Sequence, residues 1–169
     1  MQPTFAFSLY PTVDETIEMS AECDFIRATD GSYQCTVSFL KIVEPDTRMY
    51  EFKCNNLNIK RLVIQNQEVH YFPKLIPLFF PNLEELSIVN CNLKTVKSED
   101  LEGFDKLVTL NLSNNCLNHL PDDLFKHVPQ LQRVSFQNNK INLKLFEPLK
   151  NIQSFDLKGN KFSNIQILF

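Results

Sequence analysis

The amino-acid sequence predicts an α/β solenoid, a curved right-handed coil with a parallel β-sheet on its concave side and irregular or short helical segments on its convex side. Three observations predict this fold. Apolar residues recur with a period of about 24 residues through the last two thirds of the chain, as they do in repeat proteins. An asparagine or cysteine recurs at one position of that period. A β-rich segment with a turn signal precedes the first repeat and predicts an N-terminal β-hairpin cap.

The composition is that of one folded domain without the common enzyme motifs. The chain has 169 residues, of which 43% are hydrophobic and 22% are charged. Its formal net charge of −3 is not that of a nucleic-acid-binding protein. Gly31, Gly103 and Gly159 are the only glycines and lie far apart, which excludes glycine-rich dinucleotide and phosphate loops. No cofactor is predicted.

Residues 1–22 are predicted to form a leader or a disordered segment. They lack the pattern of a secretory signal peptide, because the first basic residue is Arg27 and Pro11 interrupts the first apolar run. Either the chain is not secreted by the usual route, or its true first segment is missing. The chain closes on apolar residues such as Leu168 and Phe169, which predicts a fragment with an uncapped C-terminal end. No stretch approaches the ~18 apolar residues of a transmembrane helix, so membrane insertion is not expected.

Residues 23–58 are predicted to form the N-terminal cap. The Asp-Gly dipeptide at residues 30–31 separates two β-rich runs and indicates a hairpin turn. A strict two-residue turn would place Ile26, rather than Cys23, opposite Cys35. If the two cysteines pair, the hairpin loop is therefore expected to be longer or bulged.

Repeats are predicted to fill residues 59–169. The units are 59–82, 83–106, 107–130, 131–151 and a truncated last unit, 152–169. Four positions are apolar in every unit. Position 1 holds Ile59, Leu83, Leu107, Leu131 and Ile152, and position 4 holds Leu62, Leu86, Leu110, Val134 and Phe155. Position 6 holds Ile64, Ile88, Leu112, Phe136 and Leu157, and position 11 holds Val69, Leu93, Leu117, Ile141 and Phe162. Because strand side chains alternate, positions 4 and 6 are expected to face the core, and positions 3, 5 and 7 to face the concave side.

The pattern Leu-x-x-Leu-x-Leu-x-x-Asn-x-Leu resembles the leucine-rich repeat. The tail of unit 107–130, from Leu120 to Val128, is similar to the "typical" subclass found in extracellular receptors and secreted recognition proteins. The resemblance implies a module that binds other proteins. Position 9 holds Gln67 in the first unit and asparagine or cysteine in the other four. These four are expected to form a structural ladder with the backbone of neighbouring turns, and they are Cys91, Asn115, Asn139 and Asn160.

The Cys-…-Tyr-x-Cys arrangement ahead of the repeats also resembles the N-terminal segment of secreted insect leucine-rich-repeat proteins. With this resemblance, Cys23 and Cys35 are the preferred disulfide, and Cys54 is the competing partner. The chain has five cysteines, so at least one is unpaired. Cys116 and His119 supply only two of the four ligands of a zinc site, and no metal is predicted.

The concave side is where the partner is expected to bind, because the fold demands little of residues that face solvent. Their mixed charges suit a protein partner rather than a polyanion, and Arg61 and Arg133 are the preferred hot spots. Asn111-Leu112-Ser113 is either an N-glycosylation acceptor or an ordinary repeat strand. The convex loops and the cap are the alternative contact surfaces. The predicted partner-binding residues are Arg61, Gln65, Glu85, Ser87, Thr109, Asn111, Arg133, Ser135, Gln137, Asp156 and Lys158.

The leading functional hypothesis is an extracellular module, secreted or on a cell surface, that recognises a protein ligand in immunity or cell-surface interaction. The first alternative is an intracellular scaffold or adaptor in which all cysteines are reduced. The second is self-association through the uncapped C-terminal end. An enzyme is not expected, because the adjacent carboxylates at 84–85, 99–100 and 122–123 lie on a strand edge or in convex loops.

Overall fold

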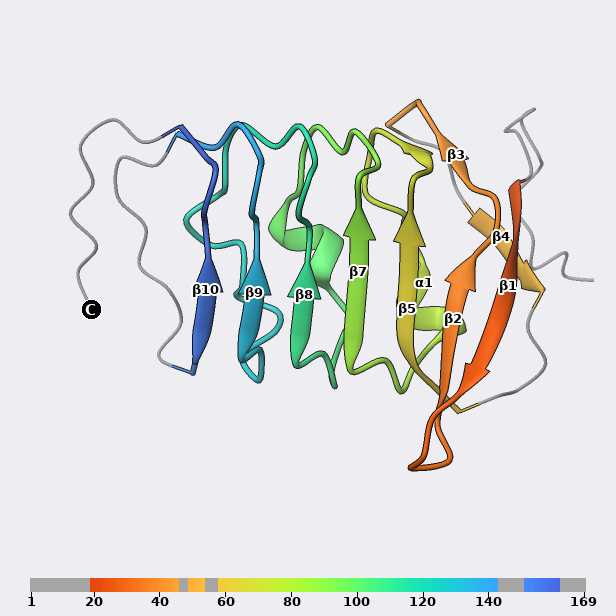
Figure 1. Cartoon of the computed structure of the whole chain (residues 1–169). Helices are drawn as coiled ribbons and strands as arrows, with labels where there is room; N and C mark the ends of the chain where they lie inside the picture. The colour runs from red at the N-terminus through yellow and green to blue at the C-terminus, as the bar shows by residue number, and fades with distance from the viewer. Residues whose placement is uncertain (1–18, 46–48, 54–57, 143–150, 162–169) are drawn as a thin grey trace, which may run out of the picture.

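The predicted solenoid is confirmed. A computed structural model describes residues 19–45, 49–53, 58–142 and 151–161, and it forms a β-solenoid of about four turns built around one long sheet (Figure 1). The strand order in this eight-stranded sheet is β10-β9-β8-β7-β5-β2-β1-β4. The chain thus runs regularly across the sheet from β5 onward, with the cap strands at one end.

Each predicted repeat contributes one short strand, and neighbouring repeat strands are parallel. The register keeps equivalent positions side by side: Leu62 pairs with Leu86, Leu86 with Leu110, and Leu110 with Val134. The solenoid therefore repeats one geometry. Its strands are β5 (Ile59–Gln65), β7 (Glu85–Val89), β8 (Thr109–Asn111), β9 (Arg133–Ser135) and β10 (Ser154–Asp156).

The cap contains the predicted hairpin. Strand β1 (Met19–Arg27) is antiparallel to β2 (Tyr33–Val37), and β2 runs parallel to β5, which joins the cap to the solenoid. Strand β4 (Met49–Lys53) adds to the outer side of β1. Because β1 already begins at Met19, the hairpin starts earlier than the predicted boundary at Cys23.

The hairpin loop spans residues 28–32 and is longer than a two-residue turn, as the cysteine positions required. In this register Phe25 lies opposite Cys35, and Cys23 lies opposite Val37. Cys23 and Cys35 are therefore diagonal neighbours on one face of the hairpin, with Cα atoms 5.2 Å apart, and they form a disulfide. The competing residue, Cys54, lies outside the described residues.

The core consists of the predicted apolar columns. Positions 1, 4, 6 and 11 are buried in the first four units, and the aromatic ring of Phe136 packs edge-on against that of Phe155 with 5.9 Å between centroids. In the last unit Ile152, Phe155 and Leu157 are only partly buried, and Phe162 lies outside the described residues. Apolar burial is the main stabilising term, and one repeat alone could not supply it.

In the described residues the helical elements of the convex side are short, and they lie behind the sheet in Figure 1. These are helix α1 (Ile76–Phe79) and the 3₁₀ helix η1 (Ser98–Leu101). Strands β3 (Lys41–Ile42) and β6 (Glu68–Val69) form a separate two-stranded sheet where the cap meets the first repeat. Pro77 in α1 packs against Gly103, and a Cβ atom on Gly103 would lie 3.2 Å from the Pro77 Cβ.

The position 9 side chains bond to the backbone of their own and neighbouring turns. Asn115 Oδ1 accepts hydrogen bonds from the backbone N–H groups of Cys91 and Leu93, both at 3.0 Å, and its Nδ2 donates to Ile88 O at 2.7 Å. Asn139 and Asn160 repeat this arrangement in the next two turns. Buried polar backbone at the end of each strand is satisfied in this way.

Candidate functional site

The concave surface carries three rows of side chains at positions 3, 5 and 7, which the strand register aligns across the sheet about 4.8 Å apart. The structure brings all the predicted partner-binding residues onto this one face. From β5 to β10, the first row (position 3) is Arg61, Glu85, Thr109, Arg133 and Ser154. The second row (position 5) is Val63, Ser87, Asn111, Ser135 and Asp156, and the third (position 7) is Gln65, Val89, Ser113, Gln137 and Lys158.

The first row holds the two predicted hot-spot arginines. Arg61 is half-buried and lies in register with Glu85 on the next strand. Arg133 is exposed, and its Nε donates a hydrogen bond to Thr109 Oγ1 at 3.1 Å. Three strand spacings, about 14 Å, separate the two arginines. The row therefore presents two cations on either side of an acidic and a hydroxyl side chain.

A hydrogen-bonded cluster occupies the centre of the face. Asn111 Oδ1 accepts hydrogen bonds from the backbone N–H and the hydroxyl of Ser113. The Ser113 hydroxyl also lies 2.8 Å from that of Ser135 on the next strand. These bonds fix the orientation of the Asn111 amide, which is half-buried within the sheet face. A glycan on Asn111 would stand in the middle of this face.

The cap, which the sequence offered as an alternative contact surface, extends the concave face beyond the repeats. Gln34 lies in register with Arg61, and Thr36 with Val63. On strand β1, Ile26 lies opposite Gln34, and its side chain is 60% exposed. Ile26 breaks the alternation of residues 23–27, and the sequence alone did not fix the hairpin register that places it on this face. Ile26 supplies an exposed apolar side chain beside an otherwise polar row.

The convex side has a hollow of about 420 Å³ between α1 and η1. Its apolar lining includes Leu75, which is 39% exposed with a left-handed φ of 70°, and Leu78, which is 75% exposed. Glu99 and Asp100 line the same hollow, so this predicted acidic pair does have a cavity beside it. The convex loops, which the sequence offered as an alternative contact surface, therefore carry a hollow with exposed apolar side chains.

The carboxylates of this region have different environments. Burial raises the pKa of Asp100, although its Oδ2 accepts a 2.8 Å hydrogen bond from the Lys97 backbone N–H. A hydrogen bond from Lys126 lowers the pKa of the exposed Asp123, at a Nζ to Oδ2 distance of 2.9 Å. Lys126 also lies 3.5 Å from Glu99 Oε1. Asp100 thus caps a turn, and Asp123 is an ion-pair partner of Lys126.

Two cysteines within the described part of the chain are free thiols. Cys91 is buried at position 9, donates to Val89 O at 3.2 Å, and has a pKa raised by burial. Cys116 is half-buried, and its Sγ lies 3.7 Å from Lys140 Nζ. The described residues contain no group of three or more histidine, cysteine or acidic side chains arranged to hold a metal ion.

Where the structure describes the chain, no helix has the length and apolar character needed to cross a membrane.

Comparison with known proteins supports the repeat assignment. Residues 81–141 match the family described as leucine rich repeat. The mouse (Mus musculus) leucine-rich repeat serine/threonine-protein kinase 1 is 30% identical over 108 residues, which make up 57% of this chain and 5% of the kinase. Mouse podocan is 33% identical over 78 residues, covering 45% of this chain and 12% of podocan. The chain thus spans a small part of the curated relatives it matches.

A solved structure, that of the LRIM1/APL1C complex, resembles the solenoid with a TM-score of 0.64 and 15% sequence identity. The likeness covers 87% of this chain and 28% of that chain, and at this identity it shows the fold alone. Repeats of this family are typically interaction modules rather than enzymes. The matched residues, the repeated strand register and the position 9 ladder together show that the repeats of this chain are leucine-rich repeats.

Proposed function

We propose that this chain is an extracellular recognition module that binds a protein partner through the concave face. One observation carries the proposal: the Arg133 guanidinium is held by Thr109 and remains exposed on a continuous, ordered face. An arginine whose position is already fixed loses less conformational freedom when it binds a carboxylate of a partner. Burial of such an arginine at the centre of an interface is typical of a hot spot.

The charges on the face favour a protein over a polyanion. Arg61, Arg133 and Lys158 alternate in space with Glu85 and Asp156. A mixed pattern of this kind gives specificity through complementary charges on the partner, whereas a polyanion would be repelled by the carboxylates. The preferred partner class is a cell-surface or immune protein.

The extracellular location rests on the cap disulfide. Cys23 and Cys35 are joined in the structure, and such bonds persist in oxidising compartments. The intracellular alternative requires both cysteines to be reduced. Mass measurement of the peptide that spans residues 23–35, before and after reduction, distinguishes the two. An increase of about 2 Da on reduction supports the proposal. If the unreduced, denatured protein is alkylated first, a peptide that has gained two alkyl groups contained free thiols and supports the alternative.

The binding proposal is tested by affinity capture from a secretome. The wild-type chain is compared with a variant that carries Arg61→Glu and Arg133→Glu. A second variant, with Lys97→Glu and Lys106→Glu, makes the same change in charge at exposed residues away from the concave face. A partner lost with the first variant and kept with the second supports the proposal. Equal capture by both variants contradicts it.

Self-association is the weaker hypothesis. Its predicted contact, at Leu168 and Phe169, lies outside the described residues. Sedimentation at high protein concentration tests it directly, because a monomer under those conditions excludes it.

A further inference from the structure

The edge of the solenoid at which the strands end has a distinct composition. We use the name strand-end edge for the part of it that follows β7, β8, β9 and β10, namely residues 90–94, 114–119, 138–142 and 158–161. The equivalent segment after β5, residues 66–70, lies outside it and carries Glu68, whose carboxylate pairs with Lys41 at 2.9 Å. Its charged side chains are all lysines: Lys94, Lys140, Lys158 and Lys161, each exposed. These four segments contain no aspartate or glutamate, although the whole chain has a net charge of −3.

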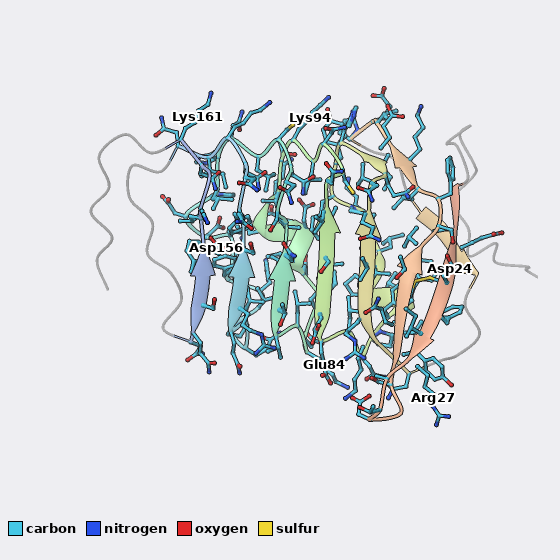
Figure 2. The ribbon with its side chains drawn as sticks, in the orientation of Figure 1. Asp24, Arg27, Glu84, Lys94, Asp156 and Lys161 are labelled. Carbon is cyan, nitrogen blue, oxygen red and sulfur yellow. A yellow bond between two sulfur atoms is a disulfide. The ribbon has the colours of Figure 1, made fainter. Side chains whose placement is uncertain are left out.

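The backbone stacks these segments in a regular row. Lys140 N donates to Leu117 O at 2.8 Å, and Lys161 N donates to Ile141 O at 3.1 Å. Lys140 and Lys161 therefore occupy equivalent positions on adjacent turns, about 4.8 Å apart along the solenoid axis. In Figure 2, Lys94 and Lys161 lie along the strand-end edge, whereas Glu84 lies at the opposite edge.

Neutral asparagine side chains form a second row beside the lysines. Asparagine occupies position 8 of the first four units with a left-handed φ of 53° to 56°, and each of these side chains is exposed. Asn90 Nδ2 donates to Asn66 Oδ1 at 2.7 Å, and Asn138 Nδ2 donates to Asn114 Oδ1 at 2.9 Å. The amides thus form an ordered row beside the lysines. A short polar side chain is well suited to this backbone conformation, and its amide is left to face solvent.

We propose that the strand-end edge binds a linear sulfated polysaccharide. Four exposed lysines along one edge, two of them at equivalent positions of adjacent turns, attract a linear polyanion, and release of its counterions favours binding. The asparagine amides offer additional donors and acceptors to sulfate and hydroxyl groups. The four segments contain no phenylalanine, tyrosine, tryptophan or arginine, and His119 is their one ring, so they offer little on which successive nucleic-acid bases could stack. The strand-end edge shares Lys158 with the position 7 row of the concave face, whereas Lys94, Lys140 and Lys161 lie outside the three concave rows. The proposal rests on these three lysines and does not depend on the protein-binding function.

The test uses immobilised heparin as the probe and the full chain as the protein. The wild type is expected to remain bound at physiological salt and to elute at higher salt. Lys140→Glu with Lys161→Glu is expected to weaken binding by about tenfold or more and to reduce the slope of log K against log salt by roughly 2, because two cationic contacts are removed. The control, Lys97→Glu with Lys106→Glu, is expected to remain within about twofold of the wild type, because it changes the same net charge elsewhere.

Circular dichroism and thermal unfolding are used to check that both variants are folded. Equal losses in the two variants would show that attraction follows net charge rather than this edge, and would overturn the proposal. Elution of the wild type below physiological salt would do the same. Single-stranded DNA serves as a second polyanion. If DNA binds more tightly than heparin and is lost with the same lysines, the edge is a nucleic-acid site and the proposal is wrong.

Discussion

Arg133 donates a hydrogen bond from its Nε to Thr109 Oγ1, across neighbouring strands of the concave sheet, at 3.1 Å. The bond uses one donor of the guanidinium and leaves the Nη donors to face solvent. Thr109 is thus a positioning residue for the arginine that we propose as a hot spot of the protein-binding face.

Thr109→Val is expected to weaken partner binding by about 2- to 10-fold, the effect of one lost hydrogen bond. The substitution keeps the β-branched shape and leaves thermal stability nearly unchanged, because the bond lies on the surface. Isothermal titration with the captured partner measures the affinity. Arg133→Lys, which has no Nε, should produce a loss at least as large. Unchanged affinity in both variants would exclude Arg133 from the interface.

The buried columns were predictable because a single physical requirement fixes them in every turn. Leu86, Leu110 and Val134 occupy equivalent places against one shared core, so their period is visible in the sequence without any other information. The concave positions followed from strand alternation alone. Which of these residues binds a partner is not encoded in the period, because each repeat can vary there without loss of stability.

Other features depend on contacts that no period determines. The hairpin register depends on the loop, where the side chain of Asp30 accepts hydrogen bonds from the backbone N–H of Ser32, at 2.9 Å, and from its hydroxyl. Lys140 and Lys161 share one position of the repeat, but Lys94 and Lys158 come from others, and only the stacked backbone shows that the four share an edge. The asparagines at position 8 repeat in the sequence at the same interval as the leucines. The interval alone does not predict their left-handed backbone or the bonds between their side chains, which depend on how adjacent turns stack.

The position 9 ladder leads to a prediction about stability. Asn139→Ala is expected to lower the free energy of unfolding by ~1–3 kcal/mol, because Leu117 N, Leu112 O and Phe136 O lose their buried partner. Urea denaturation followed by circular dichroism measures the change. Asn118→Ala is the matched control at an exposed site in the neighbouring loop and should change stability by less than about 0.5 kcal/mol. Equal effects in the two variants would show that the ladder does not stabilise the fold.

The glycines at 31 and 159 allow backbone strain to be separated from crowding. Both have a left-handed φ, of 80° and 75°, but a Cβ on Gly31 would meet open space, whereas a Cβ on Gly159 would collide with Asn138 Oδ1. Gly31→Ala should therefore cost about 1 kcal/mol from the backbone alone. Gly159→Ala should cost more, because the Asn138 side chain must also leave its bond to Asn114. Thermal unfolding of the two variants tests the order, and a smaller loss at Gly159 would contradict it.

The cap disulfide should stabilise the fold against unfolding. Cys23 and Cys35 close a loop with a sequence separation of 12, and removal of the bond by substitution of both residues with serine is expected to cost ~3 kcal/mol. Cys116→Ser is the control, because Cys116 is a free thiol. Denaturation without reductant measures both variants. A wild type whose stability is unchanged by dithiothreitol, under conditions that mass measurement shows to reduce the bond, would argue against a structural disulfide.

Asp100 and Asp123 should influence stability with opposite dependence on pH. Burial raises the pKa of Asp100, so its protonated form is favoured in the folded state, and its contribution is lost as pH rises through the folded pKa. Asp100→Asn, which keeps a side-chain acceptor for the Lys97 N–H, is therefore expected to improve stability relative to the wild type more at pH 7 than at pH 3.

The Lys126 contact lowers the pKa of Asp123, so its contribution is present above the unfolded pKa and is lost as pH falls through the folded pKa. Asp123→Asn should thus reduce stability at pH 7 and have little effect at pH 3. Urea denaturation at the two pH values measures both differences, and the same sign for the two variants would mean that burial does not dominate at Asp100.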